Sequence, residues 1–134
     1  MRWGFIVDIT NLKGLNAVTK EVKSQAIQAV STLPSRPEDL YRVEITFYQS
    51  QDRYRVDDQE KPREDRGDID NLVKHVFDGL GPIIGFRREW KKISGQLKPF
   101  KSTKPEDSKI IELVAKKVNS GSKNEFVSVE IETV

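Results

Sequence analysis

Two aspartates and a lysine at the start of an apolar helix pattern are the residues of this sequence best suited to chemistry. Asp68 and Asp70 stand where a polar stretch becomes helical, and Lys74 follows one helical turn after Asp70. Carboxylates this close repel one another unless a cation lies between them, and oxygen-only ligands suit magnesium or manganese. Such an ion can activate water and stabilise a phosphodiester in transit, and Lys74 would add positive charge beside the same phosphate.

Acidic residues at a helix start also have a structural explanation. An aspartate there accepts hydrogen bonds from free backbone N–H groups and interacts favourably with the helix dipole. By spacing alone this is the more common role for Asp68 and Asp70, because an Asp-x-Asp pattern is short. The chemical interpretation therefore depends on the surrounding sequence.

A second group of functional residue types lies between Pro82 and Pro105. The formal net charge of the chain is only +2, so a surface that binds polyanions must come from a local density of basic residues. Phe86, Trp90 and Phe100 are interleaved with these residues, where they either stack on unpaired nucleobases or anchor the segment to the core. The segment holds one acid, Glu89, and seven basic residues that we predict to contact DNA: Arg87, Arg88, Lys91, Lys92, Lys98, Lys101 and Lys104.

Hydrophobic periodicity indicates the elements that must position these residues. Alternating apolar and polar residues predict strands, and apolar residues at three- and four-residue spacing predict helices. Residues 109–118 fit a helix or a strand of a hairpin, and we favour a short turn followed by a strand. The polar stretch from Ser50 to Arg66 is predicted to be a long loop. The predicted elements are strand 2–9, helix 15–33, strand 41–49, helix 68–80 and strand 125–133, with the first two strands as partners.

The strongest functional signal is a resemblance that extends beyond the two aspartates. The run Arg66-Gly67-Asp68-Ile69-Asp70-Asn71-Leu72-Val73-Lys74, continued by Phe77-Asp78-Gly79-Leu80, resembles the signature of the RusA family of Holliday junction resolvases. Glu106-Asp107, which leads into an apolar segment, resembles the acidic pair of that family. The resemblance covers the C-terminal half well and the N-terminal half only in its strand-helix-strand order. It implies that Asp68, Asp70 and Asp107 are catalytic, metal-binding aspartates, that Lys74 is a catalytic lysine, and that Arg66 contacts DNA.

The same resemblance implies an activity and its partners. A member of this family would hydrolyse phosphodiester bonds of branched DNA with Mg²⁺, or with Mn²⁺, and leave 5′-phosphate and 3′-hydroxyl ends. It would resolve Holliday junctions by paired symmetric nicks in recombination and repair. A homodimer is implied as well, because a four-way junction offers two symmetric strands and a two-fold enzyme matches that symmetry.

The identity of the third carboxylate depends on the long basic segment, which exceeds the usual connection in the family. Glu89 lies about as far from Asp78 as the ungapped spacing would place the third acid, so it is the rival of Asp107, and Glu106 is the adjacent alternative. We favour Asp107 because it runs directly into an apolar segment, whereas Glu89 is surrounded by basic residues. On the helix, His75 is expected to be solvated and Asp78 to be a surface residue.

Length and composition limit the class of protein. At 134 residues the chain suits one RusA-like domain, 1–134, with an α+β fold in which a mixed, largely antiparallel sheet packs with two helices as an α/β sandwich. There is no cysteine and no pattern typical of a signal peptide or membrane span, which favours a cytoplasmic protein without a membrane partner. The alternatives are a DNA-binding module without catalysis that uses the basic stretch 87–104, and a protein-interaction domain. Metal dependence and salt-dependent DNA affinity distinguish the three.

Overall fold

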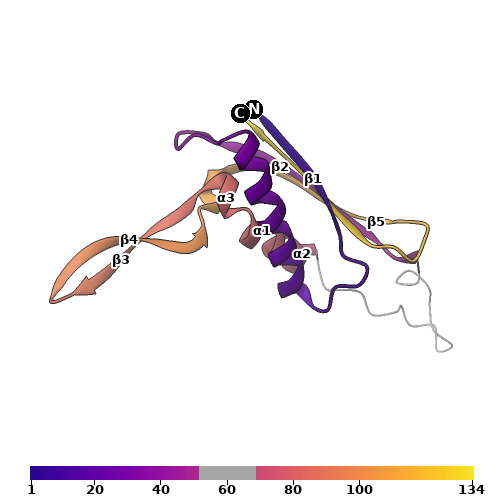
Figure 1. Ribbon diagram of the computed structural model, residues 1–134, viewed down its shortest axis with the longest axis horizontal. Coiled ribbons are helices and arrows are strands. Elements are labelled where there is room, and N and C mark those ends of the chain that lie inside the picture. Colours follow the sequence, from indigo (N-terminus) through magenta and orange to yellow (C-terminus); the bar gives the residue numbers. More distant parts are fainter. Residues whose placement is uncertain (52–68) are drawn as a thin grey trace.

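The computed structural model describes residues 1–51 and 69–134, apart from the side chain of Lys101. Arg66 and Asp68, two of the predicted site residues, therefore lie outside the described residues, as does most of the predicted loop before them. The described part contains a four-stranded sheet, a separate two-stranded sheet and three α-helices (Figure 1). The predicted α+β class, with mostly antiparallel pairing, is confirmed.

The four-stranded sheet carries the core. Its order is β1-β6-β2-β5, with β6 antiparallel to both of its neighbours and β5 parallel to β2. Alternate side chains on the two central strands, such as Val43, Ile45 and Val129, are fully buried against the helices. The strands are β1 (Arg2–Asp8), β2 (Tyr41–Gln49), β5 (Ile110–Asn119) and β6 (Phe126–Thr133), which confirms the predicted strands to within a residue or two at each end.

The predicted pairing of the first two strands is wrong, because β6 lies between them and pairs with both. Alternation shows which residues of a strand face the core, but it does not show which strand lies beside it. The segment 109–118 follows the favoured prediction, since a 3₁₀ turn, η2 (Asp107–Lys109), leads directly into β5. The helix alternative is wrong, and the strand does not form the expected hairpin, because β5 pairs with β2 rather than with β6.

Two longer helices and a short one cover one face of the sheet. The helices are α1 (Leu15–Thr32), α2 (Ile69–Gly79) and α3 (Gly81–Ile84). A Cβ atom at Gly79 would lie 2.8 Å from the carbonyl oxygen of Thr19, so the absence of a side chain allows α1 and α2 to approach closely. The short helix α3 is additional to the two predicted helices. Pro82 lies in the first turn of α3, a position that proline favours.

The basic segment between α3 and η2 folds as a hairpin, which we call the arm. It consists of β3 (Phe86–Ile93) and β4 (Gln96–Pro105), which pair antiparallel and project away from the helices and the larger sheet (Figure 1). Ser94 and Gly95 form the two-residue turn, and both have positive φ angles, 50° and 78°. This backbone conformation is typical of tight hairpin turns. Sequence periodicity did not predict these strands.

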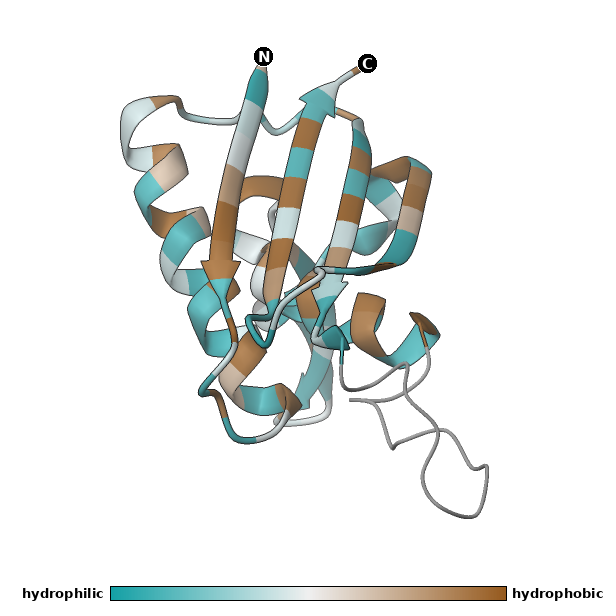
Figure 2. Cartoon of the chain, turned by 90° about the vertical axis from the view of Figure 1, so that its right-hand side faces the viewer, coloured by the Kyte–Doolittle hydropathy of each residue, from teal (hydrophilic) through white to brown (hydrophobic). Residues whose placement is uncertain are grey.

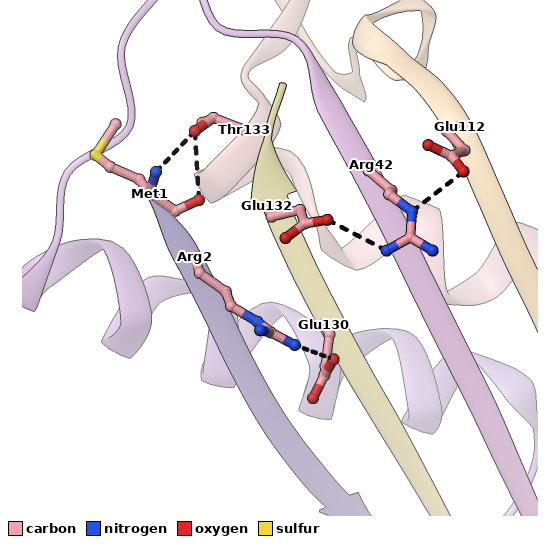
Figure 3. A network of polar contacts seen from close by, with 7 residues as sticks. All are labelled: Met1, Arg2, Arg42, Glu112, Glu130, Glu132 and Thr133. Atoms are coloured by element: carbon pink, nitrogen blue, oxygen red, sulfur yellow. Dashed lines mark hydrogen bonds and ion pairs between the residues drawn. The ribbon is translucent and has the colours of Figure 1, made fainter.

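The opposite face of the four-stranded sheet is not covered by any described helix. Figure 2 shows this face in front, with apolar and polar residues alternating along the strands. Cross-strand ion pairs occupy one end of it (Figure 3): Arg2 contacts Glu130 at 2.6 Å, and Arg42 contacts both Glu132 and Glu112 at 3.2 Å. The hydrogen bond to Glu130 raises the pKa of the Arg2 guanidinium, and those to Glu132 and Glu112 raise the pKa of Arg42. This end of the face is therefore polar and internally paired.

Candidate active site

One side of helix α2 forms the first wall of a cleft of about 620 Å³. Asp70, Lys74 and Asp78 follow one another at four-residue intervals, so their side chains lie on the same face of the helix. All three are exposed and line the cleft, with Val73 and Phe77 between them as its apolar floor. The opposite face of α2 carries the buried residues Leu72 and Val76, which hold the helix against the core.

The second wall comes from the base of the arm and from the turn that follows it. Arg87 of β3, the segment Thr103–Pro105 of β4, and Asp107 at the start of η2 line this side. The backbone N–H of Glu106 donates to the carbonyl of Gly85 at 2.9 Å, which fixes the end of β4 beside the start of β3. Asp107 is thereby held opposite the carboxylate-bearing face of α2, although it lies 37 positions after Asp70 in the chain.

An ion pair joins strand β3 of this second wall to the turn. The Nη2 atom of Arg87 donates to Oδ1 of Asp107 at 2.8 Å, and the two side chains are 43% and 44% exposed. The hydrogen bond to Asp107, with the attraction of its carboxylate, raises the pKa of the Arg87 guanidinium. Arg87 was predicted to contact DNA with the other basic residues of the arm. In the structure its guanidinium contacts a predicted catalytic aspartate, because the base of β3 lies beside η2.

The cleft has the donor chemistry that a hard divalent cation requires, but its described residues do not complete a metal site. Three carboxylates line it, those of Asp70, Asp78 and Asp107, and carboxylate oxygens suit magnesium or manganese. Within 1–51 and 69–134, however, no three acidic or histidine side chains are grouped closely enough to hold an ion. Asp68, the remaining predicted ligand, lies outside the described residues. The residues present therefore fit a magnesium ion in ligand type, and the described part holds only some of the ligands that such an ion would need.

The rival carboxylates lie elsewhere. Glu89 is on the arm, where its position in β3 pairs with Phe100 of β4, and it is not among the residues that line the cleft. Glu106 accepts a short hydrogen bond from the hydroxyl of Ser108 and is also outside the lining. The fold thus brings Asp107, rather than either rival, to the same cleft as Asp70 and Lys74.

The single histidine has no place in the cleft. His75 was expected to be solvated, but it is half-buried between α1 and α2. Its Nδ1 atom lies 3.2 Å from the hydroxyl of Thr19, and that hydroxyl donates to the carbonyl of His75 at 2.8 Å. The expectation of a solvated ring is wrong because α1 crosses α2 at this point. The histidine therefore contacts α1 and does not line the cleft.

The remaining predicted DNA contacts separate into two groups. Lys104 lines the cleft, while the others lie farther along the arm, where the described side chains are exposed: Arg88, Lys91, Lys92 and Lys98. Lys101 lies in β4, with Arg88 as its partner in β3. Asp78 and Thr103 line the cleft but were not predicted as site residues. The four-residue spacing of Asp70, Lys74 and Asp78 was a usable signal for the former, and no signal in the sequence indicated the latter.

Comparison with known proteins found no match. The sequence matches no protein-family model and no curated protein, and the structure matches no solved structure. Over the described residues, no helix is both long enough and apolar enough to cross a membrane.

Proposed function

We propose that this chain is a metal-dependent endonuclease of the RusA type that nicks branched DNA such as Holliday junctions. The observation that carries the proposal is the cleft, where Asp70, Lys74 and Asp107 meet beside an arm rich in basic residues. Carboxylates next to lysine and arginine suit a site where phosphodiester bonds are cut, because the acids hold a metal ion and the bases neutralise phosphate. The motif from Arg66 to Leu80 supports the same function through its resemblance to the family.

In this proposal Asp68, Asp70 and Asp107 hold a magnesium or manganese ion. When bound, the ion would activate water and stabilise the charge of the phosphate in transit. Lys74 contributes a positive charge from the middle of the carboxylate face of α2, where it is placed to contact a phosphate oxygen. Lys104 and Arg87 bring further positive charge from the opposite wall and position the DNA backbone across the cleft.

We further propose that two copies assemble through the open edge of β5. Among the described residues this ten-residue strand pairs only with β2, and Ile111 and Leu113 are 58% and 43% exposed. If two copies pair antiparallel about a two-fold axis at Val114, Glu112 of each lies opposite Lys116 of the other. An axis at Glu112 would instead place two glutamates opposite each other, and an axis at Lys116 would place two lysines opposite each other. Charge complementarity therefore favours one register of a continuous sheet.

The alternative function is a DNA-binding module without catalysis. The ion pair between Arg87 and Asp107 favours it, because it occupies an oxygen of a carboxylate that a nuclease would use for the metal. In this case the acids of the cleft would fasten the arm and cap α2, while the arm would supply phosphate contacts.

Metal dependence distinguishes the two functions. The protein is incubated with a synthetic four-way junction, with and without magnesium, and nicks are followed on denaturing gels. The nuclease is expected to cut only with the ion, and Asp70→Asn should abolish cutting while junction binding remains, because the basic residues are unchanged. Glu21→Gln, on the exposed surface of α1, is the matched control and should cut normally. Binding without any metal-dependent nicking would favour the module, and cutting by Asp70→Asn at the normal rate would exclude the proposed site.

A further inference from the structure

The arm is a two-stranded ribbon with little apolar packing of its own. Every residue from Lys91 to Phe100 is exposed, and among them Leu97 is 68% exposed. Trp90, just before this stretch, is 62% exposed, the largest exposed aromatic side chain of the described residues. An isolated hairpin of two strands is only marginally stable in water. Large apolar side chains on such an element indicate a surface that is covered when a partner binds.

The strand register divides the arm into two different faces. Successive side chains of a strand point to opposite sides, so Arg88, Trp90 and Lys92 share one face of β3. The pairing of Trp90 with Pro99 and of Lys92 with Leu97 places further apolar groups on this same side. On the other side Lys91 pairs with Lys98, and Glu89 pairs with Phe100. The first side, which we call the Trp90 face, therefore presents an exposed indole between two cations.

The chemistry of the Trp90 face selects its partner. Cations on both sides of the indole favour a polyanion as the partner. A purely apolar protein groove would leave these charges without partners, so it fits this face less well. An exposed flat aromatic ring between them favours a polyanion that offers flat apolar rings of its own. Nucleic acid has both properties, but in a duplex the rings are stacked on one another and are out of reach. Unpaired nucleotides leave their rings free to stack on an aromatic side chain.

We propose that the Trp90 face binds unpaired nucleotides, with Trp90 stacked on a nucleobase and with Arg88 and Lys92 on the flanking phosphates. The inference rests on the DNA-binding part of the proposed function and specifies its substrate: DNA with unpaired positions, as at a branch point, rather than continuous duplex. It requires neither the metal nor cleavage. The opposite face of the arm has cations and Phe100, a smaller aromatic side chain that is 40% exposed beside Glu89, so it contributes mainly general attraction to DNA.

Intrinsic tryptophan fluorescence tests this directly. The chain has two tryptophans, and Trp3 is 3% exposed and bonded through its indole N–H to the carbonyl of Leu33, so quenching by DNA reports on Trp90. A single-stranded oligonucleotide and a duplex of equal length are titrated in EDTA. We expect the single strand to quench the signal and to bind more tightly than the duplex. Trp90→Leu should lose roughly five- to a hundredfold in single-strand affinity, the range found when an aromatic stacking partner is removed.

Two double variants that each remove two positive charges provide the matched comparison. Arg88→Gln with Lys92→Gln removes two cations from the Trp90 face, and Lys91→Gln with Lys98→Gln removes two from the other face. The first pair should lower the salt slope of single-strand binding by about 1.4, at roughly 0.7 per phosphate contact, and should cost more single-strand affinity than the second pair, whose cations contribute mainly general attraction. The remaining fluorescence of Trp3 shows in Trp90→Leu that the body is folded.

Three results would overturn the inference: equal losses from the two double variants, equal affinity for duplex and single strand, or no quenching of Trp90. These results are independent of catalysis. If single-strand binding fails while a four-way junction is still cut with magnesium, the inference is wrong and the proposed function stands. If nicking fails while the single strand still quenches Trp90 and the Trp90-face variants bind less, the inference stands and the proposed nuclease function is wrong.

Discussion

The ion pair between Arg87 and Asp107 provides a direct test of the proposed metal site. Replacing Arg87 by Gln removes the cation that contacts Oδ1 of Asp107 and leaves a neutral, polar side chain in its place. We expect the DNA-free protein to bind Mn²⁺ more tightly after this change. Asp107 would no longer have to leave a positively charged partner before it contacts the ion, and the positive charge near the ion would be lower.

The expected size of the change follows from the geometry of the pair. A single N–O contact of 2.8 Å joins the two side chains, and both are more than two-fifths exposed, so water screens their attraction. Ion pairs of this kind contribute little to a folded protein. The dissociation constant for Mn²⁺ should therefore fall by roughly two- to fivefold, a change well below that expected for a buried, bidentate pair.

The assay is Mn²⁺ binding, followed through the magnetic resonance signal of the free ion at low ionic strength without DNA. Arg88→Gln is the matched control, because it removes the same charge one residue along the arm from a side chain that does not line the cleft. Asp107→Asn should weaken binding. If Arg87→Gln binds Mn²⁺ no more tightly than Arg88→Gln does, then the ion pair with Arg87 does not compete with the metal for the carboxylate of Asp107.

Three further predictions concern the cleft and the dimer. Lys74→Ala should lower the single-turnover rate of junction cleavage by roughly a hundredfold while affinity stays within about threefold, because Lys74 acts on the phosphate in transit; an unchanged rate would remove it from the site. Asp107→Asn should eliminate metal-dependent nicking and Glu89→Gln should keep it within about tenfold, since only the former lines the cleft; the reverse order would exchange their roles. Val114→Cys, which introduces the only cysteine of the chain, should be crosslinked between two copies by a short bismaleimide, whereas Ile27→Cys on the exposed side of α1 should not; equal crosslinking would exclude pairing through β5.

Local periodicity predicted most of the elements but not their neighbours. The strands at both ends of the chain and the helix that carries Asp70 follow from side-chain spacing, because a half-buried strand or helix must alternate in a fixed way. The position of β6 between β1 and β2 depends on paired residues that lie 118 to 130 positions apart for β1 and 78 to 92 positions apart for β2. The arm was missed for another reason: from Lys91 to Phe100 every residue is exposed, so neither face packs on a core and the apolar residues follow no periodic pattern.

The same distinction applies to the candidate site. The wall formed by α2 could be predicted, because Asp70, Lys74 and Asp78 lie at helical spacing within one element. The opposite wall could be predicted only in part. Asp107 was indicated through the family resemblance, but its partner Arg87 lies 20 residues earlier on another strand and looked like one more basic residue of the arm. A contact of that kind depends on how the arm leaves the body, which no local pattern reveals.

Arg87 connects the arm to the cleft, and this position separates the two proposed functions. Its backbone belongs to β3, while its guanidinium contacts Asp107 at the start of η2. In a binding module this pair would hold the base of the arm in place, and it would stay intact when DNA binds. In a nuclease, a phosphate that enters between Asp70 and Asp107 attracts the same guanidinium, and the carboxylate is released as the DNA binds. Binding of DNA and binding of the ion would then support each other, because both depend on separating Arg87 from Asp107.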